Sequence, residues 1–480
     1  MRSAESGRKY ELSLTARVPQ LAGKGITQEP PAERTLETVY YDTKDFRLTR
    51  AGITLRRSSD AGWCLRAPGQ ELRFPLDDAP KVPAEIAALV RAYTLDRKLR
   101  PVAQLRTDRF THRLADPAGR TVATLADDHV TGEFLGGQAL RLDRWRELDV
   151  ELAADSAPEL LDRLDRSLRK RGAENASWPS KLQRLLGAET EPARGSDHVV
   201  REYLSEQFER LRRADLGFRV GADDSVHQLR VAARKLRSAL RTFKSLAGKK
   251  KADAVAAELK WLGGELAGAR DTEVSQARLE GCLDEVPSEL VFGPLRQYLT
   301  RDFARTSQTE LARATEALSS NRYATLLQSI AALLDTVRPA GKKELRKPLR
   351  KTARKLYRAT AATEGLSGAE LEKALHEVRK KAKRARYAAD AVRPVFGKKL
   401  RTWRKHVKAA QQTLGKHQDT VVDRAALRHF AIDGFSENQN TFTFGLLYGR
   451  DEAAAKLLRD RFAREWRTLR KGACPAWLKD

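Results

Sequence analysis

Cysteine is scarce in this chain of 480 residues, and its placement excludes two of its common uses. Cys64, Cys282 and Cys474 lie far apart, without the short spacing at which cysteines hold a metal ion. Their odd number also argues against a disulfide framework. Reduced thiols packed inside the protein are therefore expected.

Long apolar runs are missing as well. A run such as Ile330–Leu334 is far shorter than the roughly 20 apolar residues that a membrane-spanning helix needs. The first residues, Met1–Glu5, lead into no apolar signal region. We therefore expect a cytoplasmic protein with no membrane span.

The chain does have length, apolar material and positive charge. At 480 residues and 41% hydrophobic, it predicts two or three domains with packed cores. Its net charge is +27, but residues 1–190 carry 32 Lys and Arg against 28 Asp and Glu, whereas residues 191–480 carry 59 against 36. Because only the second part is strongly cationic, that part is expected to have an anionic partner.

The first part of the chain has the pattern of short β-strands. The alternation of apolar and polar residues in Tyr10–Val18 is typical of a half-buried strand. Similar segments follow, separated by turn residues, at Thr38–Tyr41, Ile53–Arg56, Trp63–Arg66, Thr121–Leu125 and Trp145–Leu152. They predict an antiparallel sheet or barrel, followed by a helix over Pro158–Arg171.

Beyond about residue 198 the pattern becomes helical. Residues 188–197 carry Pro, Gly and Ser without periodicity, which is typical of a linker. Long amphipathic patterns then cover Val199–Arg213, Val226–Lys244, Lys251–Ala267, Pro294–Ala317, Leu371–Val392 and Thr402–Leu414. We predict an α+β multidomain protein, with an N-terminal antiparallel β tunnel or barrel with flanking helices over residues 1–187 and an all-α domain over residues 198–475.

The helical part contains an internal repeat. Val226–Arg230 matches Leu375–Arg379, which lies 149 residues later, and the same offset carries Gly248 onto Gly397. A repeat of this length is too long for a solenoid unit. It predicts two similar bundles, over about residues 198–340 and 342–475, packed with pseudo-two-fold symmetry around a shared surface.

A stripe of basic residues follows the first helix of this repeat. Its members lie three or four residues apart and therefore share one helix face; they are His227, Arg230, Arg234, Arg237, Arg241 and Lys244. The stripe contains no carboxylate, and it borders the apolar face at about 100°. Because like charges at this spacing repel one another, the pattern favours a bound anion over a merely solvated surface.

The second copy repeats this stripe. Its members are His376, Arg379, Lys383 and Arg386, and a further basic run holds Lys343, Lys347, Arg350 and Arg354. The two histidines have no Cys or second His nearby at ligand spacing. A structural hydrogen bond or a bond to an anion is therefore the expected role for each histidine, in preference to metal binding.

These repeated motifs resemble the CHAD family, the conserved-histidine α-helical domain. The resemblance rests on His227–Arg237 and Leu266–Asp271 and on their counterparts His376–Arg379 and Leu414–Asp419, and it covers nearly all of residues 196–475. It implies two four-helix bundles around a cationic groove, binding of inorganic polyphosphate without a required cofactor, and association with polyphosphate granules. The second copy departs in having Gln418 where the first has Arg270.

The stripe and the resemblance together assign a set of residues to polyphosphate binding. These are His227, Arg230, Arg234, Lys235, Arg237, Arg241, Lys260, Arg270, His376, Arg379, Lys383, Arg384, Arg386, Lys408 and Lys416.

The N-terminal part resembles a CYTH domain, a member of the triphosphate tunnel metalloenzymes, over roughly residues 6–187. The segments that carry this resemblance include Tyr40–Thr43, Arg50–Arg57, Gly62–Arg66, Glu147–Glu151 and Ser180–Lys181. It implies an eight-stranded tunnel that binds a nucleoside triphosphate or tripolyphosphate with Mg²⁺ or Mn²⁺. It assigns phosphate binding to Arg56, Arg57, Arg66, Arg106, Arg109 and Lys181, and metal binding to Glu11, Glu147, Asp149 and Glu151.

One strand departs from that family's pattern. Where the family has Glu-x-Glu-x-Lys, this chain has Glu11-Leu-Ser13-Leu-Thr15, so one carboxylate and the lysine are missing. Loss of ligands weakens a two-metal mechanism. An accessory phosphate-binding tunnel therefore fits the motif better than catalysis, and no residue is assigned a catalytic role.

Three functions remain open on the sequence. The first is polyphosphate binding by the helical domain, and the second is a Mg²⁺- or Mn²⁺-dependent triphosphatase that the helical domain delivers to polyphosphate. The third is nonspecific nucleic-acid binding, which the charge alone would suggest. Against the third, the stripe holds no aromatic residues for base stacking, and the chain shows no helix-turn-helix or zinc module.

Overall fold

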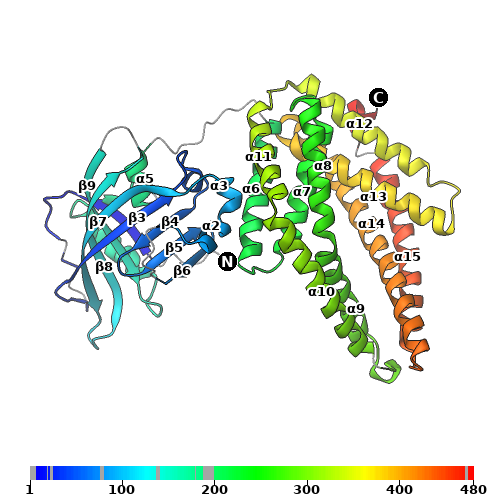
Figure 1. Cartoon of the computed structure of the whole chain (residues 1–480), viewed down its shortest axis with the longest axis horizontal. Helices are drawn as coiled ribbons and strands as arrows, with labels where there is room; N and C mark the ends of the chain where they lie inside the picture. Colours follow the sequence, from blue (N-terminus) through cyan, green and yellow to red (C-terminus); the bar gives the residue numbers. More distant parts are fainter. Residues whose placement is uncertain are drawn as a thin grey trace. The chain divides into compact units, whose positions relative to one another are not determined.

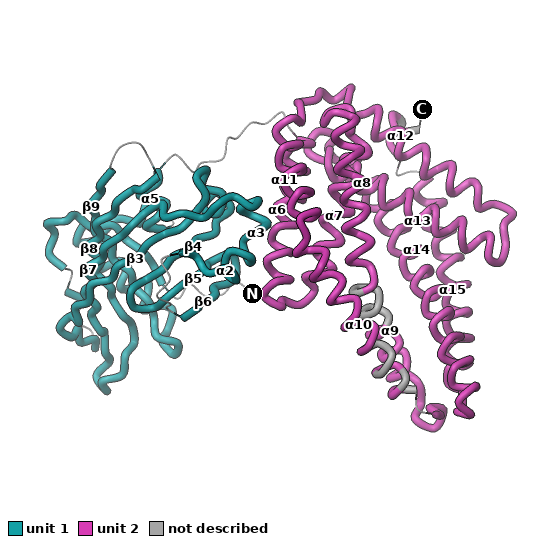
Figure 2. The backbone as a smooth tube through the Cα atoms, in the orientation of Figure 1, with its two compact units in different colours: residues 1–193 teal, residues 194–480 magenta. Residues whose placement is uncertain are grey.

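The computed structural model of the chain describes residues 7–18, 20–21, 25–75, 81–136, 141–178, 180–187, 199–293, 295–470 and 474–479. It divides into two compact units, residues 1–193 and residues 194–480 (Figure 2). The predicted linker, residues 188–197, lies outside the described residues. None of the helices in the described ranges is both long and apolar enough to cross a membrane.

An antiparallel sheet forms the N-terminal unit (Figure 1). Its described strands are β1 (Gly7–Leu12), β2 (Thr27–Gln28), β3 (Ala32–Asp42), β4 (Thr54–Ser58), β5 (Gly62–Ala67), β6 (Gln70–Phe74), β7 (Arg100–Ala115), β8 (Thr121–Phe134), β9 (Arg141–Leu152) and β10 (Glu174–Asn175). They are hydrogen-bonded in the order β10-β1-β9-β8-β7-β3-β4-β5-β6, and β2 pairs with β7. The predicted combination of an antiparallel sheet unit and an all-helical unit is confirmed.

Helices cover both faces of this sheet. Helix α4 (Glu159–Arg169) buries its leucines against Tyr10 and Leu148 on one face. Helix α5 (Lys181–Leu186) packs its own leucines against Trp145 on the other face, and it begins at Ser180, whose hydroxyl caps the helix by accepting a hydrogen bond from the N–H of Gln183. The short helices α1 (Arg47–Arg50), α2 (Ala84–Leu89) and α3 (Arg91–Thr94) lie in the connections.

The strand predicted over Tyr10–Val18 is wrong at its far end. Strand β1 ends at Leu12, and the chain turns at Ser13, whose carbonyl accepts a hydrogen bond from the N–H of Ala16 (3.1 Å). The hydroxyls of Ser13 and Thr15 lie 3.3 Å apart within this turn, and short polar side chains of this kind favour turns over strands. The two positions that depart from the triphosphate-tunnel pattern therefore fall outside the strand.

Helices make up the C-terminal unit. They are α6 (Val199–Arg219), α7 (Ser225–Thr242), α8 (Lys249–Glu265), α9 (Ala267–Asp284), α10 (Leu295–Ser319), α11 (Asn321–Thr336), α12 (Lys342–Ala361), α13 (Gly368–Ala391), α14 (Arg393–Ser436), α15 (Phe442–Thr468) and α16 (Ala476–Lys479), with a 3₁₀ turn at Ser288–Leu290. Each of the six predicted helical segments overlaps an observed helix, although Lys251–Ala267 runs across the break at Leu266 and Pro294 lies outside the described residues. Helix α14 is much longer than the predicted segment Thr402–Leu414.

These helices pack into three groups around separate apolar contacts. The first bundle consists of α6, α7, α8 and α11. The second bundle consists of α12, α13, the first part of α14 and the last part of α15. The distal bundle joins α9 and α10 to the remaining parts of α14 and α15, and its core includes Leu279, Leu283, Leu299, Leu427, Phe430, Phe444 and Leu447 (Figure 1).

Two glycines at matching positions of the sequence repeat both have a positive φ. Gly248 precedes α8 with φ 75°, and Gly397, at the matching position of the second copy, interrupts the start of α14 with φ 65°. Both values lie in the left-handed region that favours glycine. Further on the copies differ, because the chain breaks between α8 and α9 at Leu266 but continues as helix through Leu414.

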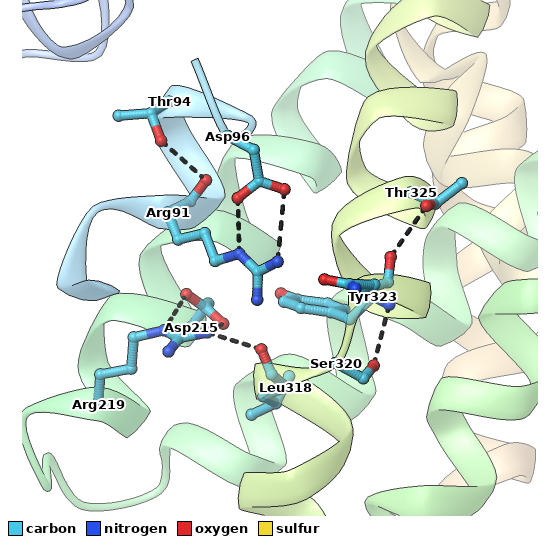
Figure 3. Close-up of polar contacts among 10 residues, drawn as sticks. Arg91, Thr94, Asp96, Asp215, Arg219, Leu318, Ser320, Tyr323 and Thr325 are labelled. Carbon is cyan, nitrogen blue, oxygen red and sulfur yellow. Dashed lines mark hydrogen bonds and ion pairs between the residues drawn. The ribbon is translucent and has the colours of Figure 1, made fainter. Parts of the chain in front are cut away.

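A second break separates α10 from α11 (Figure 3). Ser320 caps α11, because its hydroxyl accepts a hydrogen bond from the N–H of Tyr323 (3.1 Å). Arg219 of α6 forms an ion pair with Asp215 (2.8 Å) and donates a hydrogen bond to the carbonyl of Leu318 (2.8 Å). Arg219 therefore ties α6 to the last turn of α10.

Candidate functional site: a basic seam between two helices

The basic stripes of the two repeats lie on helices that pack against each other. Helix α7 buries Leu229, Leu236 and Leu240 in the first bundle, and α13 buries Leu375 and Val378 in the second. The two helices contact each other where residues 234–242 of α7 meet residues 384–387 of α13. We call the cationic residues at this contact the basic seam; they are Arg234, Lys235, Arg237 and Arg241 of α7 and Arg379, Lys383, Arg384 and Arg386 of α13.

Hydrogen bonds join the helices across the seam. The Nε of Arg234 donates a hydrogen bond to the Tyr387 hydroxyl (3.2 Å), and a guanidinium nitrogen of Arg384 donates one to the carbonyl of Arg241 (3.0 Å). The guanidinium of Arg386 lies 4.9 Å from the centre of the Tyr387 ring. Tyr387 is buried, so it fixes the arginines from both helices beside one another.

The environment of the seam disfavours the charged forms of its own side chains. Burial, followed by the charges of Arg379, Arg234 and Arg386, lowers the pKa of Lys383 from 10.5 to about 7. Burial also lowers the pKa of Arg379, and Arg234 lowers it further, although Asp419 partly offsets these effects. The pKa of Arg237 falls because of burial and then because of Arg241 and Arg234. The seam therefore concentrates like charges that solvent screens only in part.

Few internal acceptors compensate for this charge. In the part of the chain that the structure describes, none of the eight seam residues has a carboxylate within ion-pair distance, and the buried Nε atoms of Arg379 and Arg386 have no hydrogen-bond acceptor. An unsatisfied buried donor on a cationic group is costly. A polyanion that lies along the seam would supply the missing acceptors.

The two repeat histidines lie beside the seam. The Nδ1 of His376 is 2.6 Å from the side-chain oxygen of Gln418, the residue that departs from the first copy. His227 is half-buried at the matching position of α7. In the first copy the position of Gln418 is taken by Arg270, whose side chain lies outside the described residues. Gln418 thus gives His376 a hydrogen-bond partner, in agreement with a positioning role for the histidine.

Comparison with known proteins identifies the family. Residues 202–428 match the CHAD domain. Two Mycobacterium tuberculosis proteins, the uncharacterized proteins MT2285 and Rv2226, are each 34% identical to this chain over 504 residues, which cover 98% of this chain and 97% of each relative. The helical unit of the chain therefore contains a CHAD domain.

Two solved structures are also similar to this CHAD-domain chain. PptA from Streptomyces chartreusis is 22% identical, with a TM-score of 0.47, and the match covers 57% of this chain and 100% of that protein. The CHAD domain from the plant Ricinus communis is 23% identical, with a TM-score of 0.46, and the match covers 58% of this chain and 94% of that domain.

The remaining predicted residues of the CHAD domain lie in different places. Arg230 is half-buried and donates a hydrogen bond to the carbonyl of Ala267 (3.0 Å), so it holds the start of α9. Lys260 of α8 and Lys408 and Lys416 of α14 are exposed, and no described contact joins them to the seam. The structure therefore gathers the residues of α7 and α13 and leaves these three lysines on the surface of their helices.

Helix α12 adds basic residues that the sequence analysis did not single out. Burial lowers the pKa of Lys355, and the charges of Arg384, Lys351, Lys381 and Arg241 lower it further. Lys355 and Lys351 are exposed on α12 and add positive charge near Arg384 and Arg241. The basic run at Lys343, Lys347, Arg350 and Arg354 indicated that this helix is cationic, but it did not show which of its faces meets Arg384.

The sheet unit has its own set of charged residues, and strand register places them. Glu11 of β1 and Asp128 of β8 flank Glu147 of β9, so these three carboxylates share one face. Arg109 pairs in register with Asp128 and lies on that face, as do Arg56 and Arg66. Arg57 and Arg106 lie on the opposite face, because they are offset from Arg56 and Arg109 by odd numbers of residues.

Cations of the chain itself already occupy these carboxylates. The Lys181 amine lies 2.8 Å from Asp128 and 3.1 Å from Glu147, while Arg184 lies 3.0 Å from Glu11. Burial opposes the charge of Lys181, but Asp128 and Glu147 outweigh it and raise its pKa. Lys9 similarly lies 3.3 Å from Asp149, and Glu151 is exposed at the end of β9.

This arrangement does not fit a divalent metal ion. Such an ion would need several free carboxylate oxygens directed at one point. Within the described residues, no group of three or more His, Cys, Asp or Glu side chains is placed to hold a metal. Asp128 and Arg184, which were not among the predicted site residues, account for the poor fit of a metal ion. They complete an ion-pair network around Lys181 and Glu11. These two residues could be recognised only from the pairing of the strands and from the position of α5.

Proposed function

We propose that the protein binds inorganic polyphosphate along the basic seam of its CHAD domain. The observation that carries this proposal is the convergence of cations from α7 and α13 that form no ion pair with a described carboxylate; they include a lysine whose pKa has fallen to about 7. Their mutual repulsion is relieved when a dense polyanion lies among them. The match to the CHAD domain supports the same ligand.

Polyphosphate fits this seam better than nucleic acid does. The ring at its centre, Tyr387, is buried and engaged with Arg234, so it offers no free face for a base. Polyphosphate has no bases and needs only closely spaced cations. Nonspecific affinity for nucleic acid remains as a secondary property, because phosphate charge drives both interactions.

We propose an accessory role for the sheet unit. Arg56, Arg66 and Arg109 lie on one face of the antiparallel sheet, which is in keeping with the resemblance to a triphosphate tunnel. Tripolyphosphate or a nucleoside triphosphate is its proposed ligand. The ion pairs of Lys181 with Asp128 and Glu147 favour binding over metal-dependent hydrolysis. Association of the whole protein with polyphosphate granules in the cytoplasm follows as part of the proposal.

The test is a titration of labelled long-chain polyphosphate at several salt concentrations. Arg234→Glu combined with Arg379→Glu should weaken binding and lower the slope of log affinity against log salt by about two, one for each lost phosphate contact. The matched control is Arg163→Glu with Arg305→Glu, which changes the net charge equally at exposed arginines outside the seam.

Competition separates the proposed ligand from nucleic acid. Duplex DNA at equal phosphate concentration should displace little of the labelled polyphosphate. The proposal is contradicted if DNA displaces it fully, or if the seam variant and the control variant lose affinity equally.

A further inference from the structure

A cavity of about 870 Å³ lies in the second bundle, between α12, the start of α13 and the end of α15. No seam residue lines it. In the first bundle, α11 fills the space beside α6 and α8 with buried residues that include Leu326, Leu327 and Ile330. The end of α15, which closes the second bundle, buries only Phe462 and Leu469 among its described residues after Ala455. The cavity is therefore a specific difference between the two repeats.

Aromatic side chains form one wall of this cavity. The ring of Trp466 lies 5.2 Å from that of Tyr357 and 6.1 Å from that of Phe462, measured between ring centres. Tyr357 is held in place because its hydroxyl accepts a hydrogen bond from the indole N–H of Trp403 (3.2 Å), which is fully buried. Trp466 is only partly buried, so part of its ring faces the open space. Such a wall can stack against a planar ring.

Arginines surround the same cavity. Arg354 and Arg358 come from α12, and Arg459, Arg467 and Arg470 come from α15 and its end. Among the described residues, none of these five forms an ion pair with a carboxylate, and Glu364 is the one acidic residue of the lining. Arg459 also lowers the pKa of the nearby buried His417, after burial itself. The site thus combines an aromatic wall with uncompensated positive charge.

We propose that this cavity binds a nucleotide, with the base on Trp466 and the phosphates on the surrounding arginines. Its volume falls within the range of sites for small organic ligands. Inorganic polyphosphate would use the arginines but would gain nothing from Tyr357, Phe462 and Trp466. A nucleotide uses both features at once, because aromatic stacking stabilises the base and guanidinium groups bind phosphate oxygens.

The test uses a fluorescent N-methylanthraniloyl derivative of ATP, bound to the full chain in the presence of EDTA and displaced by unlabelled competitors. ATP should displace it at about one-tenth of the concentration that inorganic tripolyphosphate requires, because stacking of a base commonly contributes a factor of this size. Trp466→Leu should abolish the difference between the two competitors, whereas Trp466→Phe, which keeps an aromatic ring, should retain most of it.

The arginines are tested separately from the ring. Arg358→Glu with Arg467→Glu should weaken binding of the fluorescent nucleotide at least tenfold, with helical circular dichroism unchanged. Three outcomes would overturn the proposal: equal displacement by ATP and tripolyphosphate in the wild type, a preference for ATP that survives Trp466→Leu, or stronger displacement by dodecyl phosphate than by ATP, which would assign the cavity to a lipid.

Discussion

Lys383 should make polyphosphate binding depend on pH in a way that a permanently charged side chain would not. Its pKa of about 7 means that the free protein holds this lysine largely neutral above neutral pH. A bound polyanion supplies the compensating charge and raises the pKa toward the ordinary value of 10.5. Binding therefore takes up a proton, and affinity falls as pH rises above 7.

The magnitude follows from the two pKa values. If only protonated Lys383 binds productively, the affinity at pH 8.5 should be about 15-fold lower than at pH 7, and the change between pH 6 and pH 7 should be less than about twofold. The measurement is a fluorescence titration of labelled polyphosphate at constant ionic strength. Arginine stays charged throughout this range, so Lys383→Arg should remove the excess pH dependence and leave only that of the ligand's end groups.

Stability gives a second measurement of the same lysine. Because its folded pKa lies below its unfolded value, the unfolded chain binds more protons between pH 7 and pH 10.5, and the stability of the ligand-free protein should rise with pH in that window. Equal pH slopes for binding by the wild type and Lys383→Arg would refute the reasoning, since the seam would then not have displaced the proton from this lysine.

Two further predictions concern the sheet unit. The change Asp127→Ala leaves Arg146 without its partner in a buried ion pair (2.7 Å), so it should lower the free energy of unfolding by about 3–5 kcal/mol. Urea denaturation, followed by near-ultraviolet circular dichroism, measures this loss. A loss no greater than that caused by the exposed substitution Asp162→Ala would contradict the prediction. With Mg²⁺ or Mn²⁺, the wild-type protein should release no more phosphate from tripolyphosphate than the variant Glu147→Gln does, because Lys181 already pairs with the carboxylates. Phosphate release by the wild type that is lost in Glu147→Gln would instead support the triphosphatase.

The helical site could be predicted largely from local pattern. The three- and four-residue spacing of Arg234, Arg237 and Arg241 defines a helix face without any tertiary information. The repeat then indicated that Arg379 and Lys383 belong to the same surface. What the pattern could not show is how closely α7 and α13 approach, and therefore that Lys383 loses much of its solvent and gains Arg234 of α7 as a neighbour.

The other half of the site depended on contacts between distant segments. Strand alternation alone separates Arg56 from Arg57, but the pairing of β7 with β8 was needed to place Arg109 on Asp128. The network around Lys181 requires α5 to lie on the same face as Glu147. The cavity beside Trp466 exists because the side chains of α12 and α15 do not fill the space between them. The residue pattern of a single helix cannot predict such an unfilled space.

The breaks at Leu266 and Ser320 give the helical unit an uneven mechanical design. Helices α14 and α15 run without such breaks from the second bundle into the distal bundle, so these two bodies are joined by continuous struts. The first bundle is connected to the distal bundle through the jointed pairs α8–α9 and α10–α11. A load applied to the distal bundle would therefore be transmitted stiffly to the second bundle, which contains α13. In the first bundle, which contains α7, bending at the two joints would take up the same load.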